Sequence, residues 1–95
     1  MAFDVHVHKR VLKHLQTVPA KDREALLDAI NGLKEDPRPA KVETLHGPNY
    51  RDVMRLRVGN YRVLYKIIDA QSAVIVMLTG HRREIYDLLD RLFNA

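Results

Sequence analysis

The stretch that most constrains the fold runs from Tyr50 to Ile68, which predicts two β-strands joined by a two-residue turn at Gly59-Asn60. A glycine at the first central position is typical of a type II′ hairpin turn, whose twist matches that of the flanking strands. This turn fixes the pairing register along both strands. The expected pairs are Val58 with Tyr61, Arg57 with Arg62, Leu56 with Val63, Arg55 with Leu64 and Val53 with Lys66.

Because side chains alternate along a strand, this hairpin has two chemically different faces. One face is apolar and predicts a core: Met54, Leu56, Val58, Tyr61, Val63, Tyr65 and Ile67. The other collects positive charge: Arg51, Val53, Arg55, Arg57, Arg62, Leu64 and Lys66. Like charges that face each other across two strands cost stability unless an anion or solvent relieves them. A basic strand face is usually just solvated, but the opposition of Arg57 and Arg62 and the return of Arg82 after the next strand favour a phosphate site.

Composition bounds the class of protein. Ninety-five residues with 46% hydrophobic content predict one compact domain over residues 1–95. Lys and Arg number 16 against 12 for Asp and Glu, and this formal charge of +4 favours polyanionic partners. The absence of cysteine excludes a disulfide framework, a thiolate metal site and a Cys nucleophile. We expect a cytoplasmic protein, since no signal peptide is evident and no window approaches the ~20 apolar residues of a membrane span.

The first half of the chain predicts a strand followed by two helices. Residues 2–8 alternate as a half-buried strand does, and helical spacing begins at Lys9. The first helix places Val11, Leu12, Leu15 and Val18 on one side and Lys9, Arg10, Lys13 and His14 mostly on the other. Pro19 can start a helix but not continue one, so a second helix is expected over residues 20–34. Its apolar stripe is Leu26, Leu27, Ile30 and Leu33, and the two helices form a hairpin.

The second half predicts a loop, the basic hairpin, one more strand and a helix. Asp36-Pro37-Arg38-Pro39 ends the second helix and begins the loop. Residues 73–79 are apolar at nearly every position, which predicts a strand covered on both faces. A closing helix follows within residues 80–95, with the stripe Ile85, Leu88, Leu89, Leu92 and Phe93. The predicted fold is therefore α+β: a strand, a helix hairpin, an antiparallel β-meander and a C-terminal helix.

Together with this order of elements, the motifs R-L-R-x-G-N-Y-R-V-L-Y and G-H-R-R-x-x-Y resemble the RelE toxins of the RelE/ParE superfamily, over nearly the whole chain. RelE toxins are messenger-RNA endonucleases that act in the ribosomal A site and are held inactive by an antitoxin encoded beside them. The resemblance implies a RelB-like antitoxin, the ribosome and messenger RNA as partners, no membrane and no cofactor, and it allows a heterotetramer with the antitoxin. It implies as catalytic residues Arg55, Arg62, Arg82 and Tyr86. Val53 stands where some members carry a second catalytic lysine.

The chemistry of metal-free RNA cleavage requires cations around one phosphate. The 2′-hydroxyl attacks the adjacent phosphorus, and negative charge builds on the phosphorane oxygens and the leaving 5′-oxygen. Arginine suits this task because its planar fork binds phosphate oxygens bidentately and stays charged. Further candidates for RNA contacts are Arg51, Arg57, Lys66, His81 and Arg83. The general base could be Tyr86, His81, Glu84 or the RNA itself, and geometry must decide between them.

Several side chains have more than one interpretation. Tyr86 could pack its ring beneath the helix or present its hydroxyl to the arginines, whereas Tyr61 and Tyr65 are predicted to pack in the core. His6 and His8 are spaced as a metal pair on a strand, but no third ligand is evident, so we predict no metal site.

Three functions stay open: a RelE-like ribonuclease, a ParE-like inhibitor of DNA gyrase, and a non-catalytic module that binds RNA or a helical partner. The ParE branch tends to lack the combined arginines and C-terminal tyrosine. The ribonuclease is therefore favoured by the presence of Arg55, Arg62, Arg82 and Tyr86. In that case we expect the four arginines to converge on one concave surface: Arg55, Arg57, Arg62 and Arg82.

Overall fold

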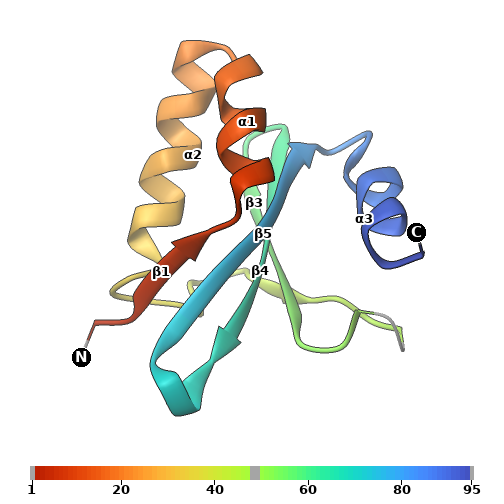
Figure 1. The fold of residues 1–95 in the computed structure, drawn as a ribbon. Helices are drawn as coiled ribbons and strands as arrows, with labels where there is room; N and C mark the ends of the chain where they lie inside the picture. The colour runs from red at the N-terminus through yellow and green to blue at the C-terminus, as the bar shows by residue number, and fades with distance from the viewer. Residues whose placement is uncertain (1, 48–49, 95) are drawn as a thin grey trace.

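A five-stranded sheet forms the centre of the protein in a computed structural model that describes residues 2–47 and 50–94 (Figure 1). The strands are β1 (Asp4–Val7), β2 (Glu43–Thr44), β3 (Val53–Val58), β4 (Tyr61–Ile68) and β5 (Ala73–His81), in the spatial order β1-β5-β4-β3-β2. The helices are α1 (Lys9–Thr17), α2 (Ala20–Gly32) and α3 (Ile85–Asn94), with a 3-10 turn at Asp69–Gln71. The strand β1 pairs with β5 in parallel, and the other neighbours pair antiparallel. The predicted α+β class and order of elements are confirmed.

The predicted hairpin register is also confirmed in full. Val58 pairs with Tyr61 and Arg57 with Arg62, and the register continues without a shift to Val53 and Lys66. Gly59 has φ of 57°, as the first central position of a type II′ turn requires, and a side chain there would be strained.

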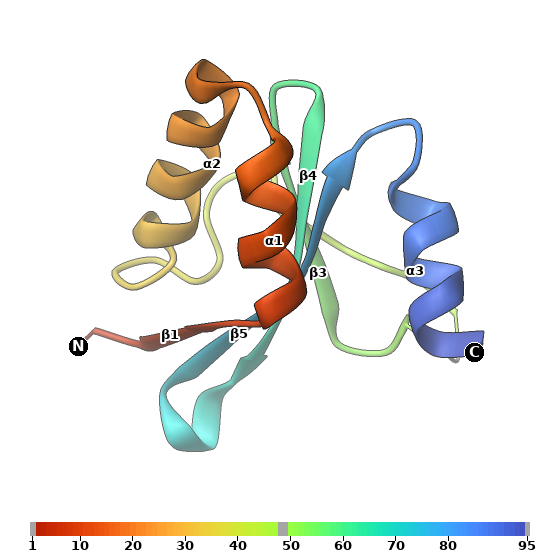
Figure 2. The ribbon, with the colours of Figure 1, turned by 45° about the horizontal axis from the view of Figure 1, so that its top comes forward.

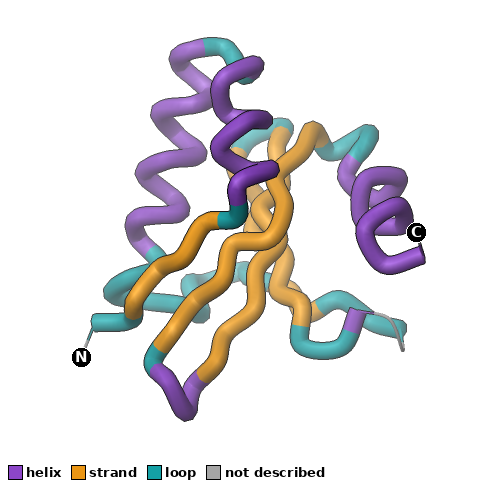
Figure 3. The backbone as a smooth tube through the Cα atoms, in the orientation of Figure 1, coloured by secondary structure: helices purple, strands orange, loops and turns teal. Residues whose placement is uncertain are grey.

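The sheet separates two layers of helices (Figures 1 and 2). The hairpin of α1 and α2 covers the face that carries Val63 and Tyr65, and these residues are buried with Val11, Leu15 and Leu26. On the opposite face, α3 forms a smaller core, which we call the α3 core: Val53, Leu64, Leu78, Ile85 and Leu89. The backbone trace shows α3 on its own side of the strands (Figure 3).

The α3 core corrects one expectation about the basic face of the hairpin. Val53 and Leu64 lie on the same strand face as the arginines, so the sequence placed them in the basic face. In the structure their exposed fractions are 0% and 1%, because α3 packs over them. The positive charge is therefore concentrated beside a small apolar core rather than spread along a solvated face.

Two leucines predicted to be buried are exposed. The exposed fraction is 51% for Leu12 and 46% for Leu27, so both predictions were wrong. The buried stripe of each helix has the spacing i, i+4, i+7, and each of these leucines follows a stripe residue by one position, which rotates it by about 100°. In α1 and its C-cap the stripe is Val11, Leu15 and Val18. In α2 and its C-cap it is Leu26, Ile30 and Leu33.

His14 was also misplaced by the sequence, which assigned it mostly to the polar side of α1. It is half-buried, and its Nδ1 lies 2.7 Å from the Oγ1 of Thr79 in β5. Burial lowers the pKa of His14, against the opposing charge of Glu84. The imidazole therefore belongs to the contact between α1 and the sheet.

Several element boundaries differ from the predictions, and β1 spans Asp4–Val7 rather than residues 2–8. The helix α2 ends at Gly32, two residues early, and β5 extends to His81 because it pairs there with Tyr61. The predicted loop contains β2, whose Glu43 and Thr44 pair with Arg55 and Met54. A two-residue strand has no periodicity from which to predict it.

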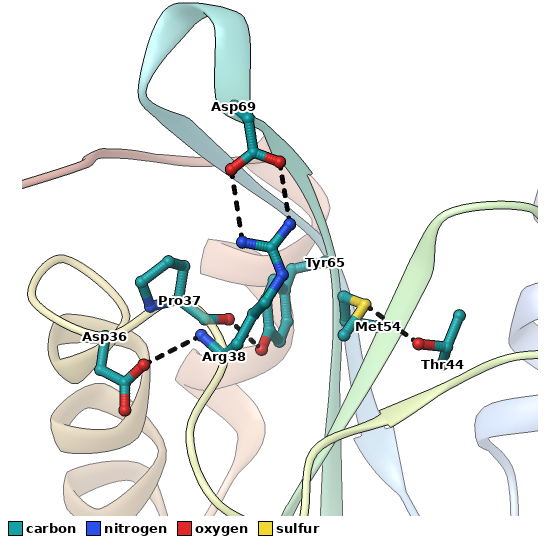
Figure 4. Close-up of polar contacts among 7 residues, drawn as sticks. All are labelled: Asp36, Pro37, Arg38, Thr44, Met54, Tyr65 and Asp69. Carbon is teal, nitrogen blue, oxygen red and sulfur yellow. Dashed lines mark hydrogen bonds and ion pairs between the residues drawn. The ribbon is translucent and has the colours of Figure 1, made fainter.

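The loop after α2 is fixed to the sheet by polar contacts (Figure 4). The Tyr65 hydroxyl donates to the carbonyl of Pro37 at 2.7 Å, and Arg38 binds both carboxylate oxygens of Asp69 at 2.8 and 3.3 Å. Burial raises the pKa of Tyr65 to about 12, and the hydrogen bond from Arg38 lowers the pKa of Asp69. Tyr65 and Tyr61 both lie on the helix-hairpin side, which confirms that they pack.

Within residues 2–47 and 50–94, no helix has the length and apolar character needed to cross a membrane.

Candidate active site

The arginines of the hairpin and the arginine that follows β5 meet beside the Gly59 turn. Arg57 and Arg62 face each other across β3 and β4, and Arg62 lies opposite Gly80 of β5. The backbone N–H of Arg82 donates to the carbonyl of Asn60 at 2.7 Å, which ties the end of β5 to the turn. The strands β3, β4 and β5 thus bring Arg57, Arg62 and the backbone of Arg82 to the same end of the sheet.

The positive charges of other arginines act on Arg62. Its pKa is lowered first by partial burial and then by the positive charges of Arg57, Arg55 and Arg82. Its Nη1 donates to the carbonyls of Gly59 (3.2 Å) and Tyr61 (2.9 Å), which orients the guanidinium. We call these four residues the arginine cluster: Arg55, Arg57, Arg62 and Arg82. The expectation that these four side chains converge on one concave surface stays a prediction.

Arg55 contacts two other elements, β2 and α3. It forms an ion pair with Glu43 of β2, and its guanidinium lies 5.8 Å from the ring centroid of Tyr86. A cation at this distance from an aromatic face is attracted to the ring. Tyr86 itself is 49% exposed, so it does not pack beneath α3. The structure places the Tyr86 ring next to the arginine cluster.

The remaining candidates for RNA contacts lie around the cluster or away from it. The Lys66 ammonium is 6.0 Å from the ring centroid of Phe93, four residues along β4 from Arg62. Arg51 and Arg83 are exposed. His81 pairs with Tyr61, and the two rings meet edge to face at 5.6 Å on the helix-hairpin side of the sheet. Of the three protein candidates for the base, only Tyr86 has a described contact with the cluster.

Two residues near the site were not singled out from the sequence. Glu43 neutralises Arg55, and no sequence signal marks it, because β2 itself was not predicted. Gly80 is the second residue, and a glycine inside an apolar strand does indicate a close approach. An added Cβ there would lie 2.9 Å from Cδ1 of Ile85 and 3.0 Å from Cδ1 of Leu88. The absence of a side chain at Gly80 therefore lets α3 lie close to β5, at the position that pairs with Arg62.

Residues 2–47 and 50–94 contain no group of three or more histidine, aspartate or glutamate side chains that could hold a metal ion. His8 has another role, because its Nδ1 accepts a hydrogen bond from the backbone N–H of Arg10 at 3.1 Å and caps α1.

These features define a small α+β protein with an arginine cluster beside the turn of its β-hairpin and a tyrosine of its last helix next to that cluster. The family model of the ParE toxin of the type II toxin-antitoxin system parDE matches residues 5–86. The chain belongs to the RelE/ParE family of type II toxin-antitoxin toxins.

Relatives on the RelE side of the family are similar over nearly the whole chain. "Putative toxin RelE1" of Methanocaldococcus jannaschii is 32% identical over 89 residues, which are 90% of this chain and 97% of that protein. The archaeal RelE-RelB complex from Pyrococcus horikoshii contains a chain with a TM-score of 0.74 and 29% identity, covering 86% of this chain and 97% of that one. The isolated E. coli RelE toxin has a TM-score of 0.70 and 25% identity, covering 96% and 99%. The resemblance to RelE toxins is confirmed.

Proposed function

We propose that this toxin is a ribosome-dependent messenger-RNA endonuclease of the cytoplasm. The observation that carries the proposal is the arginine cluster, in which Arg57 and Arg62 face each other across β3 and β4. Partial burial lowers the pKa of Arg62, and the positive charges of Arg57, Arg55 and Arg82 lower it further. Four cations held this close repel one another, and a phosphate between them would relieve that repulsion. A phosphate of an RNA backbone is the ligand that such a cluster suits best.

In the proposed reaction, the 2′-hydroxyl of the RNA attacks the adjacent phosphorus and the 5′-oxygen leaves, which yields a 2′,3′-cyclic phosphate. Arg62 and Arg82 stabilise the charge on the phosphorane oxygens, because guanidinium groups bind such oxygens in pairs. Arg55 also stabilises this charge when it releases the Glu43 carboxylate and binds the phosphate instead. Tyr86 lies next to Arg55, where its hydroxyl can move a proton at the 2′-oxygen or bind the phosphate.

The proposed partner is a RelB-like antitoxin, which inhibits the toxin until it is released. RelE chains from Pyrococcus horikoshii and E. coli that are similar in structure were solved as complexes with RelB. By analogy, residues 1–95 act as one toxin domain, and a heterotetramer with the antitoxin is one possible assembly.

The test is loss of toxicity without loss of fold. Arg62→Ala and Arg82→Ala should each lower messenger-RNA cleavage on ribosomes by ~10²-fold or more, because each removes a donor to the transition state. Growth arrest on induced expression should disappear with it. Neither change opens a cavity, so circular dichroism and thermal unfolding should stay close to those of the parent protein.

Lys21→Ala is the matched control, since it also removes one exposed positive charge but lies on α2, across the sheet from α3. It should arrest growth as the parent protein does. Full activity in Arg62→Ala would rule out the proposed role of the cluster.

The second candidate function is inhibition of DNA gyrase, which the match to the ParE toxin model favours. Inhibition by binding needs no residues that stabilise a phosphorane. Toxicity that survives in both Arg62→Ala and Arg82→Ala, together with inhibited DNA supercoiling, would select this candidate.

A further inference from the structure

The helix α3 rests on the sheet through one apolar side. Ile85 and Leu89 are four residues apart, are 1% and 0% exposed, and pack against Val53 and Leu64. Residues at this spacing lie on the same side of a helix. Apolar contacts are not directional, so they fix where α3 lies more firmly than its rotation about its own axis. Another contact is needed to define that rotation.

A directional contact comes from the segment before β3. The Tyr50 hydroxyl donates to Oδ1 of Asp90 at 2.5 Å, and the Tyr50 ring meets Phe93 edge to face at 5.8 Å. This segment passes beside the C-terminal half of α3 (Figures 1 and 2). The hydrogen bond to Asp90 raises the pKa of Tyr50, so the phenol remains a donor at neutral pH.

Asp90 is placed to control the direction of Tyr86. The two residues are four positions apart in α3, so they lie on the same side of the helix, one turn from each other. At Asp90 this side contacts Tyr50, and at Tyr86 it contacts Arg55 of β3. A rotation of α3 that breaks the first contact also carries the Tyr86 ring away from Arg55.

We propose that Tyr50 is a positioning residue, which acts through Asp90 to fix the rotation of α3 and hold Tyr86 against Arg55. The inference rests on the proposed function, in which Tyr86 belongs to the RNA site. The other end of α3 lies close to β5, because an added Cβ at Gly80 would meet Ile85 and Leu88. The helix is then held at Gly80 by packing and at Asp90 by a hydrogen bond.

The first test measures the position of Tyr86 and does not depend on activity. The ring current of Tyr86 shifts the NMR signal of the Arg55 Nε–H, and Tyr86→Leu gives the value of that signal without the ring. Tyr50→Phe keeps the aromatic ring and removes the donor, so the Arg55 signal should move toward the Tyr86→Leu value. Asp90→Ala should have the same effect from the other side of the hydrogen bond.

Two variants serve as matched controls for this shift. Asp90→Asn keeps an oxygen that accepts from Tyr50, so it should leave the Arg55 signal close to the parent value. Asp87→Asn makes the same chemical change at an exposed carboxylate of α3 and should do likewise. An unchanged Arg55 signal in Tyr50→Phe and Asp90→Ala would overturn the positioning role.

The second test measures cleavage of messenger RNA on ribosomes. Tyr50→Phe should lower kcat by roughly 10- to 100-fold, as displaced catalytic groups do, with KM unchanged because the arginines still bind the RNA. Asp90→Asn should restore most of the rate that Asp90→Ala loses. A shifted Arg55 signal with a parental cleavage rate would also overturn the proposal. If the parent protein cleaves no RNA while the NMR shifts appear, the proposed function fails and the positioning of Tyr86 stands.

Discussion

At the scale of single residues, Tyr65 shows how a polar atom is accommodated in the core. Its side chain is 0% exposed, and its hydroxyl donates to the carbonyl of Pro37, which is buried as well. The sequence predicted correctly that Tyr65 packs, because Tyr65 is two residues from Val63 and lies on the same apolar face of β4. The Pro37 partner could not be predicted, since it lies 28 residues earlier in a loop whose path depends on the whole fold.

Tyr65→Phe should destabilise the protein by about 1–3 kcal/mol at pH 7, because it leaves the buried carbonyl of Pro37 without a donor. The folded protein holds Tyr65 neutral, with a pKa of about 12 against 10.0 when unfolded. Its contribution is therefore complete below pH 10 and is lost as the pH rises through 12. Urea unfolding at pH 7, 9 and 11 should show the two proteins converging above pH 10. Equal alkaline losses in both would contradict this assignment.

At the scale of elements, local patterns were predictable and long-range coverage was not. The hairpin register followed from Gly59 and the alternation beside it, and both are local. The position of α3 on the sheet could not be predicted from local sequence patterns. Val53 and Leu64 were therefore assigned to the basic face, although α3 buries them. The strand β2 exists only through its pairing with β3.

The two adjacent leucines of α2 test how the helix hairpin packs. Leu26 is 0% exposed and Leu27 is 46% exposed. Leu26→Ala should cost about 2–5 kcal/mol because it removes buried methyl groups and leaves a cavity. Leu27→Ala should change the stability by about 0.5 kcal/mol or less, as exposed substitutions usually do. Thermal or urea unfolding of both variants measures the difference, and equal losses would mean that α2 packs in another rotation.

At the scale of the whole molecule, the fold places an arginine cluster on one face and a helix hairpin on the other. The sequence predicted the four arginines as a group because β-strand alternation and the hairpin turn bring three of them together. It could not predict that Glu43 pairs with Arg55, because β2 has no local signal. It could not predict that Asp90 contacts Tyr50, because these residues are 40 positions apart in the chain. The residues that orient the site are thus harder to predict than the residues that carry its charge.

The most direct test of the proposed function is cleavage by the purified protein of messenger RNA on translating ribosomes, with the new RNA ends analysed chemically. We expect cuts that require ribosomes, products with a 2′,3′-cyclic phosphate, and loss of cutting in Arg62→Ala. Purified antitoxin from the neighbouring gene should stop the reaction. Messenger RNA that stays intact on ribosomes, while the same preparation inhibits DNA supercoiling by gyrase, would contradict the ribonuclease and leave the gyrase inhibitor in its place.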